Sequence, residues 1–143
     1  MRLIRIFFIL IVLSFTGCAD LTSIKIVTLD STTGQPIAGV STRWLEAHHD
    51  IVLGSHYYGP TNLPTTTENG IVQVENLNTN WGSTFTFTRS GYSSVYAFYG
   101  NEHLTVAKQV EVDSFGGFIF NGNFSIITSS NGLFMVKMDP DHP

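Results

Sequence analysis

Short runs of β-favouring residues, each closed by a turn, constrain this chain more than any other feature of its sequence. The clearest run is Thr-Phe-Thr-Phe-Thr at 84–88, in which threonines alternate with phenylalanines. Because successive side chains of a strand point to opposite faces, this run predicts a half-buried strand with Phe85 and Phe87 inward. Asn-Gly pairs at 121–122 and 131–132 are typical of type I′ hairpin turns, which need positive φ at both central residues.

The remainder of the chain after residue 18 follows the same β pattern. No segment there repeats apolar residues at the three- and four-residue spacing of an amphipathic helix. Short strands separated by turns about every eight to twelve residues indicate an all-β sandwich or barrel. At 143 residues the chain suits one such domain. The expected strands cover residues 23–29, 40–47, 51–58, 71–75, 84–88, 94–99, 103–113, 118–120, 124–128 and 133–138.

Charge and cysteine content exclude several classes of function. Seven Lys and Arg against eleven Asp and Glu give a formal net charge of −4, whereas nucleic-acid-binding domains are basic. We therefore expect no nucleic-acid partner. The single cysteine, Cys18, has no second thiol with which to form a disulfide or a CxxC metal site.

The N-terminus reads as a targeting segment. Arg2 and Arg5 precede an uncharged stretch of 14 residues, 6–19, that ends before Asp20. A membrane-spanning helix needs about 20 apolar residues, so this stretch fits the apolar region of a secretory signal peptide instead.

The end of this stretch resembles a bacterial lipobox. The run Leu-Ser-Phe-Thr-Gly-Cys at 13–18 places the small residue Gly17 before Cys18, although Phe15 stands where the pattern usually has Leu. The resemblance implies cleavage after Gly17 and a diacylglyceryl anchor on Cys18, with residues 1–17 as signal peptide, 18–22 as tether and 23–143 as the β-domain. Two or more acyl chains suffice for stable membrane attachment. Residue 19 is Ala rather than Asp, which favours the outer membrane, with the domain facing the periplasm or the cell surface.

Three further motifs resemble a carboxypeptidase-regulatory-like, transthyretin-type domain. They are Thr-Gly-Gln-Pro-Ile-Ala-Gly-Val at 33–40, Thr-Thr-Glu-Asn-Gly at 66–70, and Gly91-Tyr92. The resemblance implies a prealbumin-like (Ig-like) antiparallel β-sandwich, with Val40 and Tyr92 in the core and no catalytic role. Residues 101–143 lie mostly beyond the pattern and are expected to add strands. The chain lacks the Tyr-Arg-Gly-Ser tail of the transthyretin-related hydrolases, so their activity is not implied.

The densest polar cluster is Glu46, His48, His49 and Asp50, with His56 nearby. Such side chains bind zinc and similar ions. However, adjacent histidines on a strand point to opposite faces, and no HExxH spacing is present. We interpret the cluster as a polar loop and expect no metal, cofactor or catalytic residue; a metal-assisted hydrolase using this region is the alternative.

Two aromatic residues are candidates for binding. Tyr58 and Trp81 lie beside Gly and Pro in segments that read as loops, so we expect both to be exposed. Exposed aromatics of this kind would suit a carbohydrate-binding module, a further alternative. The leading interpretation is a non-catalytic lipoprotein with a structural or binding role in the cell envelope, whose partner is a protein or a carbohydrate.

Overall fold

The structure is a computed structural model that describes residues 21–50, 54–78, 82–114, 118–120 and 122–141. Within these ranges the chain forms strands and no helix, so none of the described residues makes a helix that could cross a membrane. The strands are β1 (Leu21–Asp30), β2 (Ser41–Asp50), β3 (Gly54–Asn62), β4 (Ile71–Asn78), β5 (Ser83–Arg89), β6 (Tyr92–Gly100), β7 (His103–Ala107), β8 (Glu111–Val112), β9 (Phe118–Ile119), β10 (Phe124–Thr128) and β11 (Leu133–Met138).

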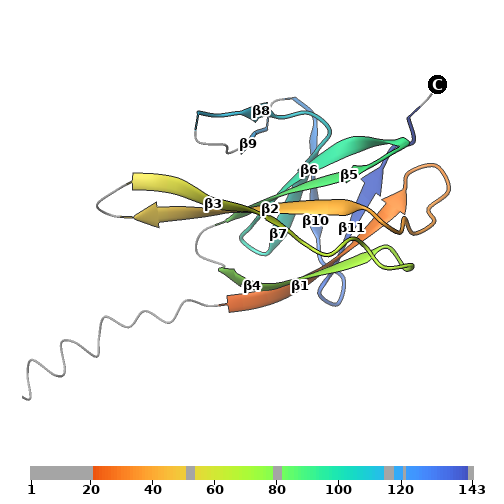
Figure 1. The fold of residues 1–143 in the computed structure, drawn as a ribbon, viewed down its shortest axis with the longest axis horizontal. Coiled ribbons are helices and arrows are strands. Elements are labelled where there is room, and N and C mark those ends of the chain that lie inside the picture. Colours follow the sequence, from red (N-terminus) through yellow and green to blue (C-terminus); the bar gives the residue numbers. More distant parts are fainter. Residues whose placement is uncertain (1–20, 51–53, 79–81, 115–117, 121, 142–143) are drawn as a thin grey trace, which may run out of the picture.

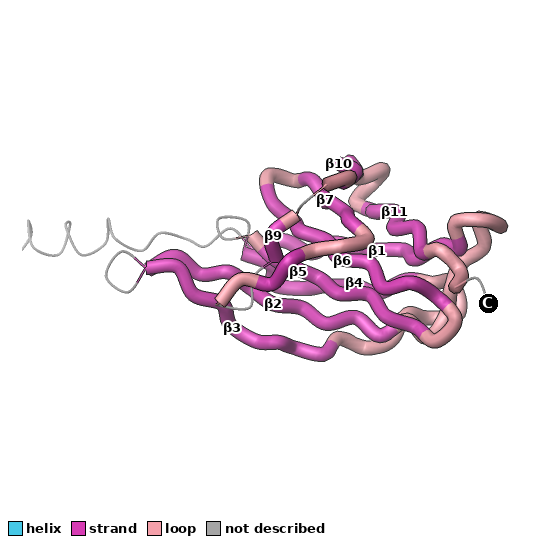
Figure 2. Tube along the Cα trace, turned by 90° about the horizontal axis from the view of Figure 1, so that it is seen from above, coloured by secondary structure: helices cyan, strands magenta, loops and turns pink. Residues whose placement is uncertain are grey.

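Two sheets of unequal width pack face to face (Figure 1). The larger has the order β10-β7-β6-β5-β2-β3, and the smaller has the order β11-β1-β4. Figure 2 shows β10 and β7 at one side of the molecule and β3 at the other. The expected all-β sandwich is confirmed, and neighbouring strands are antiparallel except β1 and β11, which run parallel.

The core lies between the two sheets and is built as the alternation predicts. Phe85 and Phe87 of β5 are fully buried and their rings stack with centroids 6.3 Å apart. Val40 is also fully buried. Thr84 points away from the core yet is buried, because β5 is a central strand and the Thr84 hydroxyl donates a hydrogen bond to the Leu45 carbonyl at 3.2 Å.

The turn after β1 is organised by one carboxylate. Asp30 accepts hydrogen bonds from the backbone amides of Thr32 and Thr33, both at 2.8 Å. The Tyr92 hydroxyl donates to the other oxygen of the same carboxylate at 3.0 Å. Tyr92, which the family resemblance places in the core, is thus half-buried, with its ring against the core and its hydroxyl holding this turn.

The run at 103–113 does not form the single long strand that its sequence predicts. β7 ends at Ala107, and Val112 of the separate strand β8 is 64% exposed. The chain leaves the sheet at Lys108, whose ammonium pairs with Asp139 after β11. It then forms the β8–β9 ribbon (Figure 1). From this ribbon the Phe118 ring meets the Tyr96 ring edge-on, with centroids 5.3 Å apart.

The Asn131-Gly132 turn forms, but not as a hairpin within one sheet. Both residues have positive φ, 54° and 74°, and Ser130 and Leu133 exchange hydrogen bonds across them. β10 then belongs to the larger sheet and β11 to the smaller, so this turn carries the chain from one layer to the other. The hairpin predicted at Asn121-Gly122 includes Asn121, which lies outside the described residues.

Candidate functional site

A groove of about 990 Å³ lies where the smaller sheet stops and the larger sheet continues. On one side is β11, the edge of the smaller sheet; on the other are β7 and β10, the flank of the larger sheet. We call this the seam groove. It is lined by Ser31, Val95, Val106, Ala107, Lys108, Gln109, Gly122, Asn123, Phe124, Ser125, Ile127, Met135, Lys137 and Asp139.

The floor of the seam groove is apolar. Val95 is buried, and Val106 and Ile127 are partly buried against the core. Strand pairing places Leu104 opposite Ile127 and Val106 opposite Ser125, so these side chains share the inner face of the larger sheet. Val106 and Ile127 are only partly buried, so part of each side chain lines the groove.

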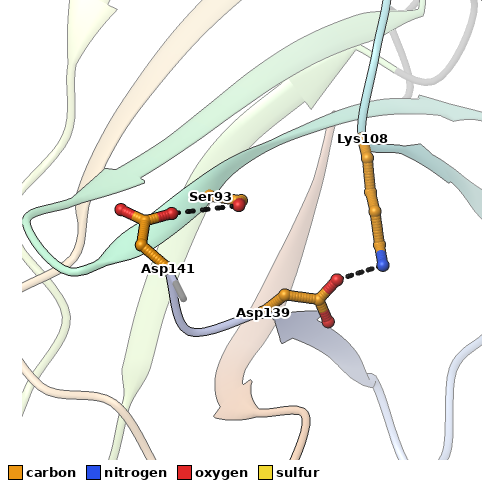
Figure 3. Close-up of polar contacts among 4 residues, drawn as sticks. All are labelled: Ser93, Lys108, Asp139 and Asp141. Carbon is orange, nitrogen blue, oxygen red and sulfur yellow. Dashed lines mark hydrogen bonds and ion pairs between the residues drawn. The ribbon is translucent and has the colours of Figure 1, made fainter. Parts of the chain in front are cut away.

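Lys108 and Asp139 of the seam groove belong to a set of polar contacts that extends to Ser93 and Asp141 (Figure 3). Lys108 pairs with Asp139, and the Ser93 hydroxyl donates to the Asp141 carboxylate at 3.1 Å. Backbone amides reinforce them: that of Ser93 donates to the Asp139 carbonyl and that of Asp141 to the Gly91 carbonyl, each at 2.9 Å. The segment after β11 is thereby fastened to the start of β6.

The polar groups that line the seam groove are two lysines, one carboxylate, two amides and two hydroxyls. A hydroxyl nucleophile needs an adjacent general base, and histidine is the usual one. Ser93 is bonded to a carboxylate that also lies on the surface, and the residues that line the seam groove include no histidine or cysteine. The groove offers apolar contact, two lysines and strand edges.

The cluster residues Glu46, His48, His49, Asp50 and His56 lie on strands, which corrects the predicted loop. β2 continues through His48 and His49 to Asp50, so the two adjacent histidines occupy opposite faces. Register pairs His48 with His56 of β3 directly across the hairpin, a juxtaposition that the sequence spacing does not reveal. The side chains of residues 48–50 and 56 are not among those that the structure describes. Among the described residues, no three His, Cys, Asp or Glu side chains form a group suited to a metal.

Tyr58 also lies on a strand rather than in the predicted loop. It belongs to β3, opposite Glu46, and is 55% exposed. β3 is the edge of the larger sheet, where Pro60 is tolerated because one side of the strand needs no partner. Trp81, Gly17 and Cys18 all lie outside the described residues.

Sequence reasoning missed the seam groove because its residues come from four strands. One local signal was present: Ile126-Ile127 breaks the alternation of β10, so an apolar side chain is presented to both faces. Ile127 reaches the core, whereas Ile126 is exposed. Only the strand order tells which face is covered.

Comparison with known proteins informs the fold alone. No protein-family model and no curated protein matches the sequence. Among solved structures, the pilus adhesin RrgA from Streptococcus pneumoniae is similar, with a TM-score of 0.52 and 15% sequence identity. The match covers 86% of this chain but 15% of the adhesin chain. The similarity therefore supports the β-sandwich fold and leaves both family resemblances as predictions.

Proposed function

We propose that this chain is a lipid-anchored, non-catalytic binding module of the bacterial cell envelope, and that the seam groove is its binding surface. The observation that carries the proposal is the seam groove itself, where the partly buried Val106 and Ile127 lie beside the exposed Phe124 and Met135. Contiguous exposed apolar surface of this kind commonly marks an interaction site. Similarity of fold to part of an adhesin is consistent with a binding role.

The binding surface is tested by cross-linking in the cell from two positions. A photoreactive side chain at Met135, on the rim of the groove, is compared with one at Ile126, which is exposed on the outer face of β10. We expect a discrete adduct from position 135 and none from position 126. Equal labelling from both positions, or no adduct from position 135, would contradict the proposal.

The anchor rests on the lipobox resemblance at Gly17-Cys18. We propose attachment to the outer membrane through Cys18, facing the periplasm or the surface. In a bacterial host, wild-type protein should enter the detergent phase with an acyl mass on its N-terminal peptide, while Cys18→Ser should be released or remain uncleaved. Identical partitioning of the two without an acyl mass would disprove the anchor and leave the groove test unaffected.

Two alternatives have an observation in their favour. The opposition of His48 and His56 favours a metal-assisted hydrolase, which the zinc experiment below tests. The exposure of Tyr58 favours a carbohydrate-binding module. The second alternative requires that Tyr58→Ala abolish retention of the protein on immobilised envelope polysaccharide, while the groove variant Met135→Ala has no effect.

A further inference from the structure

The free edge of β11 has a definite set of unused backbone groups. Among the described strands, β11 pairs with β1 alone. Two hydrogen bonds show which of its residues face that partner: the Lys25 amide donates to the Gly132 carbonyl at 3.3 Å, and the Ser31 amide donates to the Met138 carbonyl at 2.9 Å. Because backbone groups alternate in direction along a strand, the even-numbered residues of β11 face β1.

The odd-numbered residues therefore face away from β1. Leu133 is already satisfied on that side, since it exchanges hydrogen bonds with Ser130 at 3.0 and 3.1 Å. Met135 and Lys137 are left with their N–H and C=O groups directed at the edge, where no described strand pairs with them. Unpaired edge groups of this kind are a template for another strand.

A strand that pairs with this edge would also contact the seam groove. A strand added beside Met135 and Lys137 would become the fourth strand of the smaller sheet and would lie beneath β7 and β10. Its inward side chains would meet Val106 and Ile127 on the groove floor. The Ser130–Leu133 bridge at one end and the Tyr92–Pro140 bridge at the other limit its length to about that of β11.

Charge indicates which extended segment fits. The rim of the groove carries Lys108, Lys137 and Asp139. Because Lys108 is paired with Asp139, Lys137 is the positive charge that a carboxylate of the bound segment would meet. Side chains of neighbouring strands on one face interact directly, and opposite charges there are favourable. A second copy of this chain fits less well, because its net charge of −4 opposes self-association.

We propose that the edge of β11 accepts an extended segment of another protein as an added strand, with apolar side chains at alternate positions inward and a carboxylate beside Lys137. The inference rests on the proposed function only in taking the seam groove as the binding surface. In this mode backbone hydrogen bonds supply affinity and alternate side chains supply specificity.

The experiment uses the full chain in detergent and a labelled, end-capped peptide, Thr-Val-Thr-Val-Glu-Val-Thr. We expect saturable binding by fluorescence anisotropy, and hydrogen exchange at the Met135 and Lys137 amides slowed by about tenfold or more in the complex. The same peptide with Lys in place of Glu should bind several-fold more weakly. Absence of binding, or binding without slowed exchange at these two amides, would overturn the proposal.

Two protein variants form a matched pair. Met135→Pro removes the edge N–H while leaving every hydrogen bond to β1, because residue 135 faces away from that strand. Met135→Val changes the side chain but keeps the N–H. We expect the proline variant to lose peptide binding and the valine variant to retain it, both with the fold intact by circular dichroism. If the proline variant unfolds, a peptide N-methylated at alternate residues should fail to bind wild-type protein for the same reason.

Other outcomes separate this inference from the proposed function. A dimer in sedimentation velocity, with both amides protected before peptide is added, would assign the edge to a second copy and overturn the inference. A cross-linked adduct at position 135 combined with a failed peptide experiment would overturn strand addition alone.

Discussion

The centre of the sandwich and its seam contain the same kinds of side chain, but the two regions differ in burial. Phe85 of β5 is fully buried, whereas Ile126 of β10 is 63% exposed and Met135 of β11 is 48% exposed. The difference follows from facing, because Phe85 points between the sheets whereas Ile126 and Met135 alternate with inward residues and point outward. An apolar residue on a central strand therefore stabilises the fold, while one on a flank is available for an interaction.

The sharpest test of this comparison is truncation in each region. Phe85→Ala should lower the free energy of unfolding by about 3–5 kcal/mol, as is usual when a buried phenylalanine is removed. Ile126→Ala should change it by less than about 0.5 kcal/mol, because an exposed side chain loses little on truncation. Urea unfolding of both variants measures the two values. A loss of similar size for both would mean that the flank of the larger sheet is covered in solution.

Close backbone approach in the centre predicts the next largest effect. Gly70 has φ of +71°, and a Cβ there would lie 2.7 Å from the Thr28 carbonyl oxygen. Gly70→Ala should lower the free energy of unfolding by about 1–2 kcal/mol because residue 70 has a left-handed backbone. The close contact with the Thr28 carbonyl oxygen should add to this loss. Gly34→Ala is the matched control, since its φ is +72° but nothing lies within 4 Å of the new Cβ. Equal losses in thermal unfolding would show that the β1–β4 contact can relax.

Two buried threonines sharpen the comparison within the centre. The Thr28 hydroxyl donates to the Ile37 carbonyl at 3.0 Å, whereas the equally buried Thr42 hydroxyl has no hydrogen-bond partner within the described structure. Thr28→Val should cost about 1 kcal/mol, and Thr42→Val should be neutral or stabilising, because it removes an unsatisfied polar group. A clear loss of stability on Thr42→Val, measured in urea, would indicate a partner such as a buried water.

A pH-dependent effect is expected at the end of the sandwich. The Thr33 amide, helped by Thr32 and the Tyr92 hydroxyl, lowers the pKa of Asp30 below its ordinary value of 3.8, while burial opposes this shift. The charged form therefore stabilises the fold above the unfolded pKa, and this contribution is lost as the pH falls through the folded value. Asp30→Asn should be less stable than wild type at pH 7, and the gap should narrow near pH 3. A constant gap in urea midpoints across this range would contradict the assignment.

The smallest effect is expected at the β2–β3 hairpin, on the flank opposite the seam. Zinc sites need three or four protein ligands, whereas the register brings together only His48 and His56. Glu46 and Asp50 lie two residues before and two residues after His48 on β2, about 6.6 Å from it in each direction. Zinc or chelator should leave the thermal midpoint of the full chain unchanged. A zinc-dependent rise in wild type and in His49→Ala, but not in His48→Ala, would favour the hydrolase alternative.

Alternation was enough to predict the strands of the centre. The pattern of 84–88 predicts the inward faces of Phe85 and Phe87, and Ile24, Ile26 and Thr28 share a buried face as the run at 23–29 implies. Prediction failed where a local pattern continued past a tertiary contact. The apolar run at 103–113 divides after Ala107, where the chain leaves the sheet beside the Lys108–Asp139 pair, whose residues lie 31 apart in sequence.

By itself, the sequence determined where the central strands lie, where most turns lie and which face of each central strand is apolar, because these properties depend on neighbours along the chain. Only the tertiary structure decided which apolar faces are covered. Strand order places β10 at one edge of the wider sheet and β11 at the edge of the narrower one, although a single tight turn joins them. The seam groove and the free edge of β11 result from this separation, since both depend on the difference in width between the layers.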